Sequence, residues 1–186
     1  MRIIGGSRRG LKLTEVGEGD SAAHLRPTSD RVREAIFNLL INAHGNPVAG
    51  ARVLDLFAGT GALGLEALSR GAAEVTFVDD GAKALALMKS NIAKMGAGDA
   101  SRILRQNATR LTPNAGAPFT LVFLDPPYGK GLGEAALTSA LKGGWLAPGA
   151  MVVWEEGTAV TVPEGFERAD QRKYGDTVVT LMRGPE

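Results

Sequence analysis

The chain has 186 residues, of which 44% are apolar and 22% are charged, so it is about the length of one domain and can form one hydrophobic core. It contains no cysteine and only His24 and His44, which excludes disulfides and thiolate sites and leaves too few histidines for a histidine-rich metal site. No apolar run is long enough for a membrane helix or a signal peptide. We therefore expect a monomeric, cytoplasmic protein without a metal, and its net charge of +1 means that any nucleic-acid surface is local.

The first 33 residues are more basic than the chain as a whole. They hold seven basic and four acidic side chains, a local net charge of +3. A solvated surface and a nucleic-acid contact are both consistent with this charge. Residues 1–28 are predicted to form a basic N-terminal extension, in which the small and polar residues Gly17 to Ala23 make a mobile loop. The exposed basic candidates in and beside this extension are Arg2, Arg8, Arg9, Lys12, Arg26 and Arg31.

A helix is predicted to begin near Ser29. Thr28, Ser29 and Asp30 offer N-terminal caps and a first-turn acid. Apolar residues then recur at helical spacing and predict one buried stripe, formed by Val32, Ala35, Ile36, Leu39 and Leu40. Arg31 and Arg33 are expected on the opposite, polar face, where this helix could present positive charge near the site.

From Ala51 onward, short apolar runs alternate with helical patterns, which is typical of a parallel sheet covered by helices. Strands are predicted at 52–57, 74–79, 102–106, 119–124 and 150–155. One helix is marked by Leu85, Met88, Ile92 and Met95, with Gly96 as its C-terminal cap. Phe166–Tyr174 and Thr177–Met182 flank Gly175-Asp176 and predict an antiparallel hairpin. Residues 29–186 are therefore expected to form an α/β, Rossmann-like, seven-stranded mixed sheet with helices on both faces and a C-terminal hairpin.

The first strand runs into a glycine-rich segment, Asp55-Leu56-Phe57-Ala58-Gly59-Thr60-Gly61-Ala62-Leu63-Gly64. Its glycines let the backbone turn sharply and approach a ligand at a helix N-terminus. Asp79 ends the second strand and could accept hydrogen bonds from ribose hydroxyls, which fits a nicotinamide enzyme as well. Asp55 favours S-adenosylmethionine, since a carboxylate beside the loop would repel a pyrophosphate but suits an ammonium and a sulfonium. A glycine-rich turn without a ligand remains the structural alternative.

The third predicted strand ends at Gln106-Asn107-Ala108. From this position Asn107, with Ala108, could reach the adenine ring of a cofactor that lies across the strand ends. Asn107 could equally cap a short helix that follows it. The two roles are compatible.

The strongest chemical signal is the apolar strand that ends in Asp125-Pro126-Pro127-Tyr128. Two prolines fix the backbone and end the ladder of hydrogen bonds. An exocyclic amine is a poor nucleophile, and it becomes a better one when acceptors such as the Asp125 carboxylate and the Pro126 carbonyl hold its N–H groups. Tyr128 could stack on a base that is flipped out or unpaired. Lys130 could meet a phosphate or face solvent, and a simple proline turn with a packed tyrosine is the alternative to a reaction centre.

These motifs resemble those of the S-adenosylmethionine-dependent amino-methyltransferases, and the resemblance narrows to the bacterial 16S rRNA guanine-N2 methyltransferases of the RsmD family. It extends over nearly the whole length and includes Arg2-Ile3-Ile4-Gly5-Gly6, Leu25 to Glu34, Gly61 to Gly71 and Gly144-Trp145-Leu146. It implies N2-methylation of a guanine in 16S ribosomal RNA, within a small-subunit particle, with an RNA contact in the basic extension. The implied cofactor residues are Asp55, Phe57, Ala58, Gly59, Thr60, Gly61 and Asp79, although the family usually has a longer glutamate where this chain has Asp79.

Two other classes of protein stay open at this point. An N6-adenine or N4-cytosine DNA methyltransferase uses the same chemistry on a ring-conjugated amine, but such enzymes usually carry a separate target-recognition domain, for which 186 residues leave no room. A non-catalytic dinucleotide-binding or RNA-binding module would not need Asp125 or the proline pair.

Overall fold

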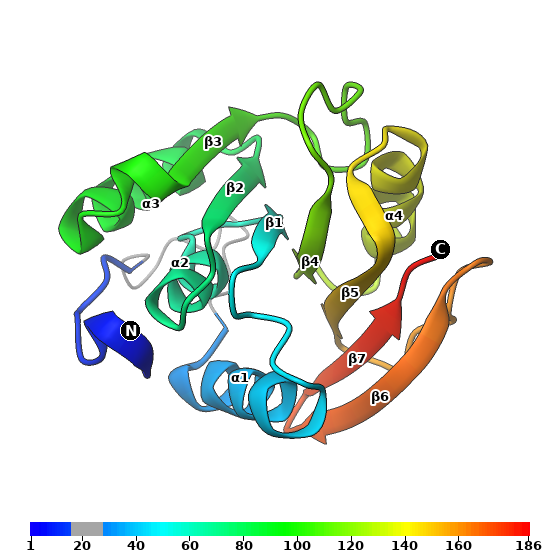
Figure 1. The fold of residues 1–186 in the computed structure, drawn as a ribbon, viewed down its shortest axis with the longest axis horizontal. Coiled ribbons are helices and arrows are strands. Elements are labelled where there is room, and N and C mark those ends of the chain that lie inside the picture. The colour runs from blue at the N-terminus through cyan, green and yellow to red at the C-terminus, as the bar shows by residue number, and fades with distance from the viewer. Residues whose placement is uncertain (16–27) are drawn as a thin grey trace.

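The computed structural model describes residues 1–15 and 28–186 (Figure 1). The predicted loop Gly17 to Ala23 and the candidate contact Arg26 lie outside the described residues. The helices are η1 Gly6–Arg8, α1 Asp30–Ala43, α2 Ala62–Ser69, α3 Ala82–Met95, η3 Gly98–Ala100 and α4 Leu132–Lys142. The strands are β1 Arg52–Leu56, β2 Glu74–Asp79, β3 Ser101–Arg105, β4 Phe119–Leu124, β5 Leu146–Glu156, β6 Glu167–Tyr174 and β7 Thr177–Arg183.

The strands form one seven-stranded sheet in the order β3-β2-β1-β4-β5-β7-β6. The first five in this order are parallel, and the hairpin of β6 and β7 adds antiparallel to β5. The predicted mixed sheet with a C-terminal hairpin is thus confirmed. β5 begins at Leu146, earlier than the predicted residue 150, because Leu146 pairs with Phe119 before an irregularity in the register.

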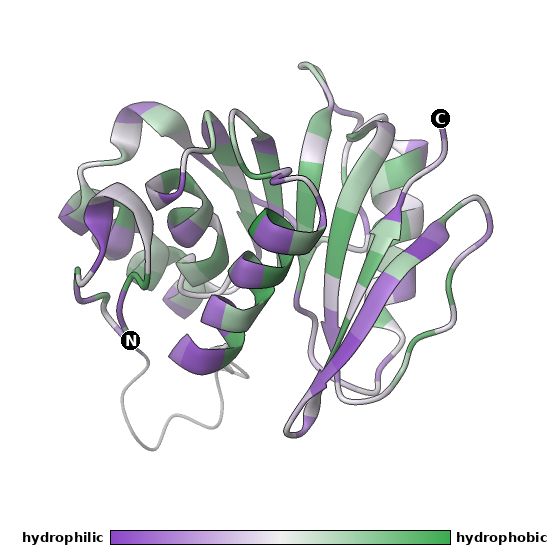
Figure 2. Ribbon diagram, turned by 60° about the horizontal axis from the view of Figure 1, so that its bottom comes forward, coloured by the Kyte–Doolittle hydropathy of each residue, from purple (hydrophilic) through white to green (hydrophobic). Residues whose placement is uncertain are grey.

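Helices cover both faces of the sheet, as predicted. Alternate strand residues such as Val53, Phe77 and Phe123 pack with α1, α2 and α3, whereas Leu54, Val122 and others pack with α4 on the opposite face. Figure 2 shows hydrophobic residues along the central strands and on the sheet side of α1, while β6 is hydrophilic. A hydrophilic edge strand discourages pairing with other chains. Within the described residues, no helix is long and apolar enough to cross a membrane.

The N-terminal segment packs against this domain. Arg2 and Lys12 form an antiparallel bridge, and the Ile3 amide donates to the Leu11 carbonyl over 2.9 Å. Ile3 and Leu13 are buried in the same hydrophobic cluster as α1, α2 and α3. The basic side chains of residues 1–15 are therefore presented by backbone that is anchored in the core.

Helix α1 begins where the sequence predicts, since the Ser29 hydroxyl accepts a hydrogen bond from the Val32 amide at 3.2 Å. The predicted position of Arg33 on its polar face is wrong, because this side chain is fully buried. The buried stripe is Arg33, Ile36, Phe37 and Leu40, whereas Val32, Ala35 and Leu39 are only half-buried. The stripe is rotated because Arg33 has a buried partner, Glu66 of α2, at 3.1 Å. Arg31 is exposed, as expected.

Candidate active site

A cavity of about 520 Å³ lies at the carboxyl ends of the parallel strands. β1 stands between β2 and β4, so the chain crosses to opposite sides of β1, and ligands of open α/β sheets bind at such a reversal. The predicted site residues that line the cavity are Asp55, Phe57, Ala58, Gly59, Thr60, Asp79, Asn107, Asp125, Pro126, Pro127 and Tyr128. Two predicted residues, Gly61 and Ala108, are buried beside it and do not line it.

The turn after β1 depends on left-handed backbone conformations. Gly59 and Gly61 have φ values of 57° and 80°, and Phe57 has a φ of 56° although it is not glycine. Such a conformation is strained for a residue with a side chain and clusters at ligand sites. Gly64 is needed for a different reason, because a Cβ there would lie 2.4 Å from Cε1 of Phe77. Gly59, Gly61 and Gly64 together allow the start of α2 to lie close to β1 and β2.

Asp55 lies beneath this turn. Its Oδ2 accepts a hydrogen bond from the Gly64 amide at 3.0 Å, and the residue is only 1% exposed. Burial raises the pKa of Asp55 well above its usual value, the Gly64 hydrogen bond opposes this, and the nearby carboxylates of Asp125 and Asp79 add to it. A cationic ligand in the cavity would favour the ionised form, so the position suits an ammonium or sulfonium group.

Asp79 joins two loops at the end of β2. Its Oδ2 accepts from the Gly59 amide and its Oδ1 from the Gly81 amide, both at 2.9 Å. Each carboxylate oxygen has a second lone pair, so Asp79 can still accept a hydrogen bond from a ribose hydroxyl.

Asn107 follows β3 and lines the cavity. Its Oδ1 accepts from the amide and the hydroxyl of Thr109, at 2.9 and 2.7 Å. The alternative role of Asn107 as the cap of a short helix is not observed, because residues 108 and 109 form a turn that this side chain closes.

The reaction-centre segment, Asp125-Pro126-Pro127-Tyr128, leaves the sheet directly after β4. The carboxylate of Glu156 accepts hydrogen bonds from the amides of Gly129 and Gly157, each at 3.0 Å, and so joins the segment after Tyr128 to the end of β5. The hydroxyl of Tyr128 lies 3.1 Å from Thr177 Oγ1 at the start of β7. A Cβ on Gly157 would lie 3.1 Å from Cδ2 of Tyr128, so glycine lets this loop approach the ring. Glu156 and Thr177 were not expected at the site, because only the fold brings them there.

Two more residues at the site escaped the sequence analysis. The Thr28 hydroxyl lies 3.1 Å from Asp125 Oδ2 and 3.2 and 3.3 Å from the two carboxylate oxygens of Glu155 in β5. The sequence pattern indicates Thr28 only as a helix cap, and Ser29 takes that role instead. Its partners are 97 and 127 residues away along the chain, so no local pattern could indicate them.

Buried side chains connect the N-terminal segment, residues 1–15, to the glycine-rich turn after β1. Asn91 of α3 donates from Nδ2 to the carbonyls of Thr60 and Thr14, at 2.9 and 3.1 Å, and accepts from the Thr14 amide. Glu66 accepts hydrogen bonds from the amides of Ile4 and Gly5. The first residues are therefore held in place relative to the wall of the cavity, of which Thr60 is part.

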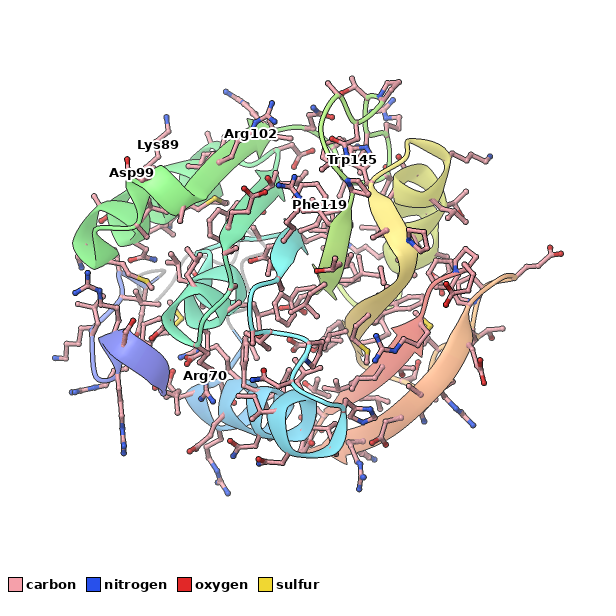
Figure 3. The ribbon with its side chains drawn as sticks, viewed as in Figure 1. Arg70, Lys89, Asp99, Arg102, Phe119 and Trp145 are labelled. Atoms are coloured by element: carbon pink, nitrogen blue, oxygen red, sulfur yellow. The ribbon has the colours of Figure 1, made fainter. Side chains whose placement is uncertain are left out.

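Arg70 completes this network between α1 and α2 (Figure 3). Its Nε lies 2.9 Å from Glu66 Oε2, and its guanidinium lies 5.1 Å from the ring centroid of Phe37. Both partners hold α1 and α2 together beneath the N-terminal segment.

The predicted RNA contacts are exposed wherever the structure describes them, namely at Arg2, Arg8, Arg9, Lys12, Arg31 and Lys130. Lys130 follows the reaction-centre segment after one residue, Gly129. Figure 3 shows two further basic side chains, Lys89 of α3 and Arg102 of β3, which point away from the domain. In residues 1–15 and 28–186, no group of three or more histidine, aspartate or glutamate side chains is arranged to hold a metal ion.

Comparison with known proteins identifies relatives over the whole chain. Residues 1–183 match the family described as conserved hypothetical protein 95. The chain is 40% identical over 98% of its length to ribosomal RNA small subunit methyltransferase D of Escherichia coli strain K12, 89% of which is covered. The protein of the same name from Haemophilus influenzae is 32% identical, with 94% of this chain and 89% of that protein covered.

A solved structure agrees with this relationship. The Escherichia coli protein described as a methyltransferase and named yhhF superimposes with a TM-score of 0.83 at 37% identity, and covers 100% of this chain and 98% of its own. The resemblance drawn from the motifs is thus confirmed for sequence and for fold. The chain belongs to the RsmD family of methyltransferases.

Proposed function

We propose that the cavity binds S-adenosylmethionine and that the enzyme methylates the N2 amine of a guanine in 16S ribosomal RNA of the small subunit. One observation carries the proposal. The cofactor turn around Asp55 and the segment Asp125-Pro126-Pro127-Tyr128 line the same cavity. A methyl donor and an acceptor amine could therefore meet at the ends of β1 and β4.

The residues present fit the cofactor. Asp55 offers a buried carboxylate to a cationic amino-acid moiety, and Asp79 offers acceptors to a ribose. Asn107 offers its Nδ2 donor to an adenine ring, since its Oδ1 already accepts two hydrogen bonds from Thr109. A side chain at Gly64 would fill the space in which Asp55 meets the start of α2, since its Cβ would lie 3.0 Å from Asp55 Oδ2. When bound, S-adenosylmethionine supplies a methyl group whose bond to sulfur breaks with the electron pair left on sulfur.

The chain contributes orientation and electrostatics to the transfer. Acceptors on Asp125 and Pro126 would hold the amine so that its lone pair forms the new nitrogen–carbon bond. The nitrogen loses one proton in the process, and within the segment the Asp125 carboxylate is the group that could accept it. Tyr128 would stack on the target base, which must leave its helix to enter the cavity.

The substrate assignment rests on the relatives and on the exposed charge. Both relatives named above are ribosomal RNA small subunit methyltransferases. Residues 1–28 would contact the RNA phosphates, with Arg31 and Lys130 extending the contact towards the cavity. We take the small-subunit particle as the substrate, because both relatives are named for ribosomal RNA of the small subunit.

Methyl transfer from labelled S-adenosylmethionine tests the proposal directly. Small subunits that lack the modification, naked 16S ribosomal RNA and DNA serve as substrates, and the modified nucleoside is identified after digestion. We expect label in N2-methylguanosine of small subunits. Label confined to N6-methyladenine or N4-methylcytosine of DNA would replace the guanine proposal by the DNA alternative, and full activity on a short stem-loop would contradict the role of the particle.

The RNA-contact proposal has its own test. Replacing Arg8 and Arg9 by alanine should weaken RNA binding and lower the slope of log affinity against log salt by about two, because each lost phosphate contact removes roughly one released counterion. The matched control replaces Arg168 and Arg183, which are exposed on the β6–β7 hairpin. An unchanged salt slope in the Arg8 and Arg9 variant would return this segment to ordinary surface.

A further inference from the structure

A hydroxyl between two carboxylates lies at the edge of the cavity and is not explained by the proposed function. Thr28 Oγ1 is 3.1 Å from Asp125 Oδ2 and 3.2 Å from Glu155 Oε1. Asp125 is half-buried and lines the cavity, whereas Glu155 is 2% exposed and lies behind it. Methyl transfer, as proposed above, uses Asp125 but assigns no part to Thr28 or Glu155.

The place of Thr28 is set by the core and by α1. Its carbonyl accepts from Arg33 Nη1 at 3.5 Å, and Arg33 is in turn held by Glu66 at 3.1 Å. Ser29, the next residue, caps α1. The hydroxyl is thereby placed across the ends of β4 and β5 by contacts that do not involve either carboxylate.

A count of protons decides how this group can be bonded. A threonine hydroxyl has one hydrogen to donate and two lone pairs that accept. If both carboxylates were ionised, only one of them could receive that hydrogen, and the other would face an oxygen lone pair. Each carboxyl group has a separate, two-centre hydrogen bond with Thr28 only when one of the two carries a proton and donates it to the hydroxyl.

Glu155 is the carboxyl group that should hold the proton. Burial raises the pKa of Glu155 well above its usual value, and the charge of Asp125 raises it further. The Thr28 hydrogen bond lowers it, Asp55 raises it, and Arg33 lowers it. Asp125 borders the cavity, so its charge is less costly there than that of Glu155 in the interior.

We propose that Glu155 is protonated in the active enzyme and donates to the hydroxyl of Thr28, which donates to Oδ2 of Asp125 and holds that carboxylate ionised and oriented. Thr28 and Glu155 are thus positioning residues that act through Asp125. The last step rests on the proposed function, since it takes Asp125 as the group that meets the substrate amine.

The protonation of Glu155 can be measured without substrate. The infrared spectrum of the protein at neutral pH should contain the carbonyl band of a buried protonated carboxyl group, and Glu155→Gln should remove it. The matched control is Glu134→Gln on the exposed side of α4, which should remove carboxylate absorption instead. Any band from buried Asp55 is common to both spectra and cancels in the difference. Loss of carboxylate absorption in Glu155→Gln would overturn the proposal whether or not the protein methylates RNA.

Kinetics test the action through Asp125. Thr28→Val should lower kcat about ten- to hundredfold, the range for losing one hydrogen bond to a charged group, with the KM for RNA and the affinity for S-adenosylmethionine little changed. Thr28→Ser should restore most of kcat. Thr120→Val, an exposed threonine at the opposite end of β4, is the matched control and should match the wild type. Unchanged kcat in Thr28→Val would overturn the positioning role.

The pH profile separates a proton donor from a structural contact. Glu155→Gln keeps a neutral donor beside Thr28, so it should retain kcat near the wild-type value, and it should lose the alkaline decline that ionisation of Glu155 causes in the wild type. Activity as low as that of an Asp125→Ala variant would overturn the assignment, because Glu155 would then be needed in its ionised form. If the wild type modified no RNA, the proposed function would fail while the infrared result still decided the protonation of Glu155.

Discussion

The buried carboxylate of Glu66 allows a quantitative test of how the N-terminal segment is held. It accepts from the amides of Ile4 and Gly5, each at 2.9 Å, and from Nε of Arg33 and Arg70, at 3.1 and 2.9 Å. Its side chain is fully buried. In Glu66→Gln, the new amide group would place a donor against two of these donors. Buried Arg33 would keep only the exposed carboxylate of Asp30, 2.9 Å from its Nη2, as a counter-charge.

Breaking a buried pair by changing one partner costs about 3–5 kcal/mol of unfolding free energy. For a chain of this size, that corresponds to a fall of about 6–20 °C in the unfolding temperature. Urea unfolding followed by circular dichroism measures the loss. The m-value should stay unchanged if unfolding of the variant exposes the same surface area as unfolding of the wild type. Hydrogen exchange at the Ile4 and Gly5 amides should accelerate in the variant more than global stability alone explains.

Glu74→Gln is the matched control, because Glu74 forms an ion pair with Arg52 that is 41% exposed on the Glu74 side. Surface pairs of this kind contribute about 0–1 kcal/mol. If Glu66→Gln cost no more than Glu74→Gln, the network around Arg33 would not be what anchors the first residues, and the account of α1 given above would be refuted.

Three further changes have direct outcomes. Gly64→Ala would place a Cβ 2.4 Å from Phe77, and it should destabilise the fold by about 1–3 kcal/mol in urea unfolding; Gly98→Ala, where the space is open, should be near neutral, and equal effects would mean that the turn has room. Asp125→Ala should lower turnover by about a hundredfold or more with cofactor affinity little changed in equilibrium dialysis, whereas turnover within a few fold of wild type would remove Asp125 from the reaction. Burial raises the pKa of Asp170, but hydrogen bonds from His44, Arg172 and the Gln171 amide outweigh it and lower the pKa below its usual 3.8. The stabilisation is therefore present above about pH 4 and is lost as the pH falls through the lowered value, so Asp170→Asn should cost about 0.5–1 kcal/mol near neutral pH and little near pH 2; a cost that does not vary with pH would contradict this ion pair.

Local patterns predicted most elements of the fold. Apolar runs of strand length gave β2 and β4 their observed bounds, and the spacing of Leu85, Met88, Ile92 and Met95 predicted α3 with Gly96 as its left-handed cap. These features succeed because backbone periodicity and glycine conformations are properties of neighbouring residues.

The candidate site was predicted in part for the same reason. Parallel strands bring their carboxyl ends to one edge, so residues such as Asp55, Asp79 and Asp125 at strand ends were expected to meet, and they line one cavity. Residues whose role depends on a partner from elsewhere in the chain were missed. Thr28, Glu155 and Glu156 carry no local signal that distinguishes them from a helix cap or from the end of an apolar strand.

The sequence by itself determined the α/β architecture, the glycine turn and the acid-proline-proline-tyrosine segment, because each follows from residues close together in the chain. Only the tertiary structure decided that Arg33 is buried against Glu66 rather than exposed, and that Thr28 lies between Asp125 and Glu155. Burying a charge is costly in isolation and acceptable when a partner is fixed opposite to it, and that partner is supplied by the folded chain. The orientation of α1, and with it the position of Thr28 beside Glu155, therefore depends on contacts between distant residues, which the spacing of apolar residues does not predict.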